Sequence, residues 1–242
     1  MENNFENNYD NYQGGSTHLR VASEADRTVF YKKTYGHVAG GVLLFVLFEY
    51  LLLQSSVVVD FMLSMTVGYK WLLLLGGFML VTTYAESTAM KTADKSKQYL
   101  AYAIYVLAQA VIFVPMIYVA AFYMETGSEM LQQAALVTLA LFTGLTAVVM
   151  LTGKDFSFLK AGLTIGFFIA LGLIIAGTIF GFDLGLWFSG AMCLLAAGSI
   201  LYQTSQIVNK YTTEDYIPAA LGLFASLMLL FWYILRIFMS RD

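Results

Sequence analysis

The sequence predicts an all-α integral membrane protein with seven transmembrane helices. Of its 242 residues, 59% are hydrophobic and only 12% are charged, and the mean hydropathy is +0.71. Soluble globular domains carry about 25% charged residues. The chain contains seven apolar runs close to the roughly 20 residues that a helix needs to cross a bilayer. These runs are continuous and the chain has only two prolines, which excludes the alternating pattern of a membrane β-barrel.

The first three helices are predicted near residues 37–59, 69–86 and 99–123. The first run is too long for the apolar segment of a secretory signal, so we expect it to be retained as a membrane anchor. The third run contains Pro115, which cannot donate a backbone hydrogen bond and is expected to kink the helix.

The remaining helices are predicted near residues 131–151, 158–181, 184–208 and 217–238. In the fifth helix, Gly162 and Gly166 are four residues apart and form a small-residue face, which favours close packing against another helix. The single cysteine, Cys193, lies inside the sixth run, so an internal disulfide is impossible. The seventh run is apolar throughout, and residues 31–242 together form the predicted membrane domain.

Residues 1–30 differ in composition from the rest of the chain. They are rich in asparagine, acidic residues, glycine and serine, and they contain no apolar core. Such a segment buries too little apolar surface to offset the entropy of ordering it. The sequence therefore predicts a disordered cytoplasmic tail over residues 1–30.

The basic residues are concentrated in alternate loops. Ten precede the first helix or lie near the loops after the second, fourth and sixth: Arg20, Arg27, Lys32, Lys33, Lys91, Lys95, Lys97, Lys154, Lys160 and Lys210. The other side has only Lys70, Arg236 and Arg241. The positive-inside rule therefore places the N-terminus in the cytoplasm and the C-terminus outside. The net charge is −3 and no basic patch contains interleaved aromatics, so we expect no nucleic-acid partner.

The apolar runs of this chain lack the residues that enzymatic catalysis inside a membrane would need. The two histidines, His18 and His37, lie in the tail and at the start of the first helix, and no metal-ligating histidine pair exists. Ser189 is not in a nucleophile elbow, because Trp187 stands where that motif has glycine. We therefore expect no catalytic activity, no metal centre and no cofactor.

Two acidic residues fall within the apolar runs. Glu49 lies in the middle of the first helix, where an acid costs about 2.5 to 3.5 kcal/mol. It is therefore predicted to be protonated or hydrogen-bonded inside the bundle, and a functional and a structural role are equally open. Glu86 lies at the cytoplasmic end of the second helix, where we expect headgroup water to solvate it. Both are candidates for an ion or proton pathway.

Four stretches resemble the Bax inhibitor-1 family, also called the transmembrane Bax-inhibitor-motif family. They are VFYKKTYGHVAGGVLL, KDFSFLKAGLTIG, ILYQTSQIV and AALGLFASLMLLFWYILRIF, and the resemblance extends over residues 28–240. It implies a seven-helix fold in which the last helix is surrounded by the other six. It also implies that some members conduct a slow, pH-sensitive calcium leak, controlled by paired aspartates on the sixth and seventh helices.

The aspartate positions carry uncharged residues in this chain. Tyr202, Gln203 and Thr204 match the family's Tyr-Asp-Thr-like stretch, and the position on the seventh helix falls on Ser226. Two close acids share a proton because each raises the pKa of the other, and ionised acids supply the hard oxygens that calcium prefers. An amide and a hydroxyl do neither. Gln203 and Ser226 therefore predict weakened proton and calcium sensing, or a plain interhelical hydrogen bond.

Two functional hypotheses remain open at this stage. One is a leak pathway for cations, linked to calcium or protons, that runs past Gln203, Ser226, Glu49 and Glu86. The other is a non-conducting membrane protein that binds other membrane proteins, such as a quality-control protease. In both cases the lipid bilayer is the first partner, and the compact chain without a predicted cleaved signal suits a bacterial inner membrane.

Overall fold

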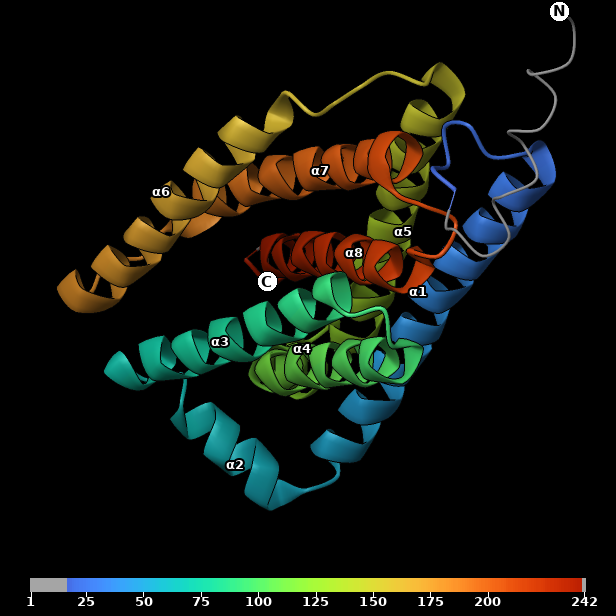
Figure 1. The fold of residues 1–242 in the computed structure, drawn as a ribbon. Coiled ribbons are helices and arrows are strands. Elements are labelled where there is room, and N and C mark those ends of the chain that lie inside the picture. Colours follow the sequence, from blue (N-terminus) through green and yellow to red (C-terminus); the bar gives the residue numbers. More distant parts are fainter. Residues whose placement is uncertain (1–16, 241–242) are drawn as a thin grey trace, which may run out of the picture.

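The computed structural model describes residues 17–240, and these residues form eight α-helices (Figure 1). The helices are α1 (Glu24–Leu53), α2 (Ser56–Ser64), α3 (Tyr69–Lys91), α4 (Lys95–Tyr123), α5 (Gly127–Thr152), α6 (Leu159–Phe180), α7 (Gly185–Lys210) and α8 (Tyr216–Met239). In this part of the chain, all except α2 are long and apolar enough to cross a membrane. The predicted all-helical protein with seven spanning segments is confirmed.

The predicted first helix is wrong at both ends. The run 37–59 corresponds to α1, which begins earlier, at Glu24, and to part of the separate short helix α2. α1 begins early because the Ser23 side chain accepts a hydrogen bond from the backbone N–H of Asp26 at 3.1 Å, which caps the helix. The run is divided at Ser55, whose side chain accepts a hydrogen bond from the backbone N–H of Val58 and starts α2.

The segment before α1 is ordered against the loop between α7 and α8. The Leu19 backbone N–H donates to the Tyr211 carbonyl at 3.0 Å, and the Thr213 N–H donates to the Thr17 carbonyl at 2.9 Å. The Leu19 side chain is buried. The predicted disordered tail of residues 1–30 therefore differs from the structure over residues 17–30, and the rest of that prediction lies outside the described residues.

The last helix occupies the middle of the bundle. α8 packs against α1, α3, α4, α5 and α7, whereas α6 packs mainly against α7 and makes a smaller contact with α3 (Figure 1). α4 is as deeply buried as α8, since 56% of the most apolar part of each is buried, against 11% for α6. The seventh spanning helix is thus central as predicted, and it shares that position with α4.

The loops that carry the basic residues meet at one end of the bundle, which we call the basic end. There the Lys95 ammonium group donates to the Glu214 backbone carbonyl, and its Nζ lies 3.5 Å from Glu214 Oε2. The ammonium groups of Lys33 and Lys95 lie 4.9 and 4.5 Å from the centroid of the Tyr216 ring. α1, α4 and the α7–α8 loop are therefore joined at this end, which the positive charges predict to be cytoplasmic.

Candidate functional site

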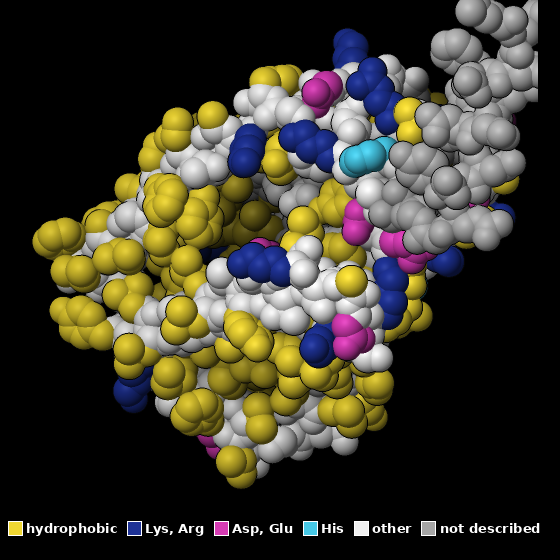
Figure 2. All heavy atoms as spheres, viewed as in Figure 1, with side chains coloured by type: hydrophobic (Ala, Val, Ile, Leu, Met, Phe, Trp, Pro, Cys, Tyr) yellow, Lys and Arg dark blue, Asp and Glu magenta, His cyan; other side chains and the backbone are white. Residues whose placement is uncertain are grey.

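Two cavities lie among α3, α7 and α8. The central cavity has a volume of about 510 Å³ and reaches from Glu86 and Gln203 to Asp183 and Arg236. The basic-end cavity, of about 470 Å³, reaches from the same Glu86 and Gln203 to Lys210. Figure 2 shows the surface hollowed between α7 and α3, with hydrophobic side chains around the hollow. Glu86 and Gln203, which we call the shared wall, therefore separate two cavities that lead toward opposite ends of the bundle.

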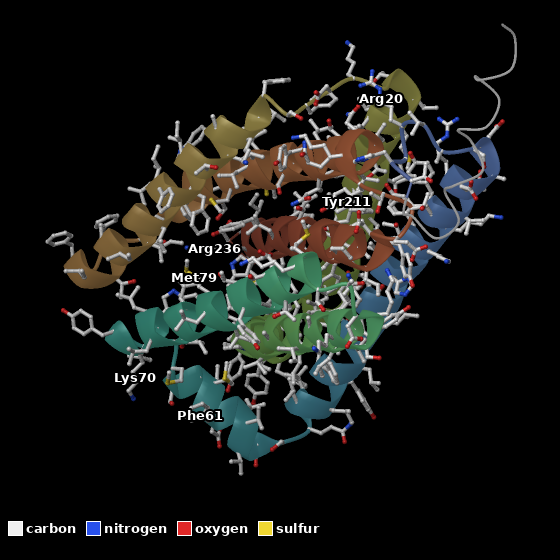
Figure 3. All side chains as sticks on the ribbon, viewed as in Figure 1. Arg20, Phe61, Lys70, Met79, Tyr211 and Arg236 are labelled. Carbon is white, nitrogen blue, oxygen red and sulfur yellow. The ribbon has the colours of Figure 1, made fainter. Side chains whose placement is uncertain are left out.

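Two of the side chains labelled in Figure 3 mark the two cavities. Tyr211 lines the basic-end cavity and Arg236 lines the central cavity, and Figure 3 shows them toward opposite ends of α8. At the far end of the central cavity, Arg236 Nη2 lies 3.4 Å from Asp183 Oδ1. This ion pair connects α8 to the loop between α6 and α7.

Gln203 lies on α7 directly against the backbone of α8. A Cβ atom added to Gly222 would lie 2.9 Å from Gln203 Oε1 and 3.1 Å from its Cδ, closer than a side chain at that position tolerates. The absence of a side chain on Gly222 therefore allows the Gln203 amide to fill the space between the two cavities.

Ser226 has a different partner from the one expected. Its hydroxyl donates to the Gly222 carbonyl at 3.0 Å, and its Oγ lies 2.8 Å from Ser199 Oγ. Since the Ser226 proton is used on α8, Ser199 is the donor between the two hydroxyls. Among residues 17–240 no hydrogen bond joins Gln203 to Ser226, although both line the central cavity. The antiparallel register pairs Gln203 with Gly222 and Ser199 with Ser226, one helical turn apart.

Glu86 faces Tyr105 on α4. The Tyr105 hydroxyl interacts with the Glu86 carboxylate, and it accepts a hydrogen bond from Gln109 Nε2 at 3.4 Å. Glu86 takes part in none of the three ion pairs formed by the described residues. The sequence predicts a solvated Glu86, and in the structure the residue is exposed and also lines both cavities.

Glu49 lies apart from this group. Only 5% of its surface is exposed, and neither carboxylate oxygen has a hydrogen-bond partner among the described residues. It lines neither the central nor the basic-end cavity. An unpaired charge at such a position would cost several kcal/mol, so the neutral acid is the form that fits. Of the four candidate pathway residues, the structure brings together Gln203, Ser226 and Glu86 and leaves out Glu49.

The other polar residues at the end of α7 anchor the loop between α5 and α6. The Ser205 hydroxyl donates to Asp155 Oδ1 at 3.1 Å and accepts from the Phe156 N–H at 2.8 Å, and Gln206 Nε2 donates to Ser157 Oγ at 2.9 Å. Hydrogen bonds from Ser157, and then from Ser205, hold the pKa of Asp155 below its ordinary value of 3.8. Gln206 therefore holds a loop, while Gln203, one turn earlier, lies in the shared wall.

Sequence reasoning missed two features of the site. It did not assign Tyr105, although Tyr105 and Gln109 are four residues apart and so share a helix face. It placed Arg236 on the side opposite the basic loops but did not pair it with Asp183. An acid and an arginine near the ends of consecutive spanning helices were the available signal.

The sequence comparison identifies the family. The family described as "Inhibitor of apoptosis-promoting Bax1" matches residues 27–242. The chain is a member of the Bax inhibitor-1 family. The resemblance noted in the sequence is therefore confirmed, and family membership agrees with the seven spanning helices of a multi-pass integral membrane protein.

Similar proteins of this family come from bacteria, animals and viruses. An uncharacterized protein of Pseudomonas aeruginosa is 36% identical over 116 residues, covering 48% of this chain and 52% of the relative. Lifeguard 4 of Mus musculus is 32% identical over 108 residues, covering 43% and 44%. A Golgi anti-apoptotic protein of vaccinia virus is 30% identical over 114 residues, covering 45% and 46%. Each alignment spans about half the length of the relative.

Proposed function

We propose that the protein is a slow cation leak pathway across a membrane, in which the central and basic-end cavities meet at Glu86 and Gln203. The observation that carries this proposal is that two cavities from opposite ends of the bundle share only these two wall residues. A small displacement of the Gln203 amide, a flexible side chain, would join them. Bacterial relatives such as the one from Pseudomonas aeruginosa support a bacterial inner membrane as the location.

The charges along the cavities favour cations. Glu86 is exposed and has no ion-pair partner among residues 17–240, so its carboxylate puts an uncompensated negative charge where the two cavities meet. Gln203, Ser199 and Ser226 add neutral oxygen atoms. Calcium normally takes six to eight oxygen ligands with several carboxylates, so a wall with one acid supports a weak calcium preference.

The first test is ion flux into liposomes that contain the purified protein. Replacing Gln203 with leucine puts an apolar side chain into the shared wall, so we expect calcium and monovalent-cation flux to fall about tenfold or more, which corresponds to roughly 1.4 kcal/mol in the barrier. Gln133 is an exposed glutamine at the opposite end of the bundle, so Gln133→Leu is the matched control and should leave flux unchanged. Equal flux in wild type and Gln203→Leu would exclude the shared wall as the pathway.

The double variant Gln203→Asp with Ser226→Asp tests the missing acids. Both positions line the central cavity, so two carboxylates there would titrate as a coupled pair, with one apparent pKa raised toward neutrality. We expect calcium flux to rise and to change between about pH 6 and 8, while each single variant and the wild type respond weakly. A strongly pH-dependent wild type would place the sensing group elsewhere.

The alternative function is a non-conducting modulator of other membrane proteins. It is supported if purified, folded protein conducts neither calcium nor monovalent cations under any of these conditions. In that case the polar shared wall serves packing between α7 and α8, and the cavities stay closed.

A further inference from the structure

A third hollow, separate from the two cavities of the candidate site, lies between α1 and α4. Its volume is about 370 Å³, and it is lined by residues of α1 between Lys32 and Leu44 and by Tyr102 of α4. We call it the α1 hollow, and Figure 1 shows α1 at the edge of the bundle. The distance from Lys32 to Leu44 is about 18 Å along the helix axis. The hollow is therefore about as long as one leaflet of a hydrocarbon core roughly 30 Å thick.

The floor of the α1 hollow is made by glycine. Gly36 and Gly40 are exposed, and a Cβ atom added to either would meet nothing within 4 Å. No contact among the described residues therefore requires glycine there, although glycine destabilises a helix relative to alanine. Gly41 differs, because it makes room for the Tyr102 hydroxyl, which donates to the His37 carbonyl at 2.8 Å. This contact fixes α1 on α4 and leaves the two other glycines open to the outside.

Positive charge lies at one end of the hollow. Lys32 and Lys33 are exposed, and no acid is among the residues that line the hollow. Neither lysine belongs to the three ion pairs formed by residues 17–240. Residues 34–53 of α1 contain no lysine or arginine, and at 1.5 Å per residue they cover the roughly 30 Å of hydrocarbon. The two ammonium groups therefore lie at the level of the lipid headgroups, and the glycines lie below them in the hydrocarbon.

An anionic lipid fits both parts of this hollow. Lysines near the membrane surface attract anionic lipids, and the hollow lies at the basic end, which the positive charges predict to be cytoplasmic. A helix of another protein could also lie on a glycine face, but the two unpaired lysines favour a ligand with an anion at headgroup level. We propose that the α1 hollow binds one anionic phospholipid, with its phosphate at the two lysines and an acyl chain along Gly36 and Gly40. The site is independent of the proposed leak, because it lies apart from the shared wall.

Photo-crosslinking locates the lipid on the full-length protein in nanodiscs of phosphatidylcholine. The probe is phosphatidylglycerol with a diazirine in the middle of one acyl chain, and mass spectrometry identifies the labelled residues. We expect labelling of residues 40–44 that saturates as the share of the probe rises. A phosphatidylcholine probe with the same chains should label them about tenfold less. Unlabelled phosphatidylglycerol should displace the probe, whereas sodium phosphate should not, because it has no acyl chain.

Charge variants test the headgroup end. Lys32→Gln with Lys33→Gln should reduce the labelling about tenfold, since both positive charges are lost. Lys32→Arg with Lys33→Arg keeps the charges and should retain the labelling. Lys154 and Lys160 are exposed lysines outside the hollow at the same end of the bundle. Lys154→Gln with Lys160→Gln removes the same charge and should be labelled as wild type is.

Glycine variants test the floor. Gly36→Leu with Gly40→Leu fills the hollow while the lysines remain, so labelling should again fall about tenfold. Gly144 and Gly172 are also exposed, meet nothing within 4 Å and lie outside the hollow, so Gly144→Leu with Gly172→Leu is the matched control. If gel filtration shows that the first variant is misfolded, Gly36→Ala with Gly40→Ala replaces it, and we expect a several-fold loss.

Three results would overturn the proposal. Equal labelling by the two probes would show that the headgroup charge is not recognised. An equal loss in the Lys154 and Lys160 control would indicate general attraction to the membrane surface. Unchanged labelling in the folded Gly36 and Gly40 variant would show that no acyl chain lies on the floor. If that variant also changes a dimer into a monomer in light scattering, the floor is a docking site for another helix instead.

Discussion

Glu49 provides a direct test of how the bundle treats a buried acid. Its side chain is 5% exposed on a face of α1, and both oxygens lack a partner among residues 17–240. Burying a polar group without a hydrogen bond costs about 1 to 3 kcal/mol. Methionine has similar length and an unbranched apolar chain that adapts to its surroundings. Glu49→Met should therefore raise the free energy of unfolding by about 1 to 3 kcal/mol.

The assay is thermal unfolding in one fixed detergent, followed by gel filtration of the protein that stays folded. For a chain of this size, 1 kcal/mol corresponds to roughly 2 to 4 °C, so Glu49→Met should raise Tm by about 2 to 12 °C. Glu49→Gln keeps a neutral polar group of similar shape and should stay within about 1 kcal/mol of wild type. The control is Gln54→Met, at an exposed position just after α1.

Two results would refute this reasoning. A lower Tm for Glu49→Met would mean that the carboxyl group has a stabilising partner, such as a buried water or ion, in the folded protein. A change in the pH dependence of transport in Glu49→Gln would mean that Glu49 titrates during function. Because Glu49 lines neither the central nor the basic-end cavity, we expect neither result.

Two further predictions concern packing and the loop anchor. Gly41→Ala should destabilise the fold by about 1 to 3 kcal/mol, because the new Cβ would lie 2.1 Å from the Tyr102 hydroxyl oxygen. The adjacent Gly40→Ala meets nothing within 4 Å and should be neutral or stabilising in the same thermal assay. Ser205→Ala removes the acceptor of the Phe156 N–H, so hydrogen exchange at that amide should speed up by about tenfold, roughly the loss of one hydrogen bond. Unchanged exchange would show that the hydrogen bond does not hold the loop.

The number and type of the spanning helices could be predicted because long apolar runs have few alternatives in a bilayer. The ends of the helices were less predictable. Ser55 divides an apolar run into α1 and α2 by capping a new helix, and one serine inside such a run gives no strong signal in advance. The order of residues 17–23 depends on backbone hydrogen bonds to the distant α7–α8 loop, which composition alone does not reveal.

The candidate site was predictable in part. The polar face of the sixth spanning helix can be read from the sequence, since Ser199, Gln203 and Gln206 recur at helical spacing. It could not give the register between α7 and α8. That register is fixed by how closely the two backbones approach, and it puts Gln203 at Gly222 and Ser226 at Ser199.

A polar residue inside an apolar helix predicts a free-energy cost of burial, but it does not predict where in the bundle the side chain lies. Glu49 and Glu86 both lie in apolar runs, yet Glu49 is enclosed without a partner while Glu86 faces two cavities and Tyr105. The difference arises from packing. α1 is held tightly against α4 and α8, whereas α6 leaves much of α3 uncovered because it packs mainly on α7. Next to this open side, the exposed Glu86 and the half-buried Gln203 line both cavities. If the proposed leak is right, the position of α6 matters more than any single side chain for whether the two cavities can join.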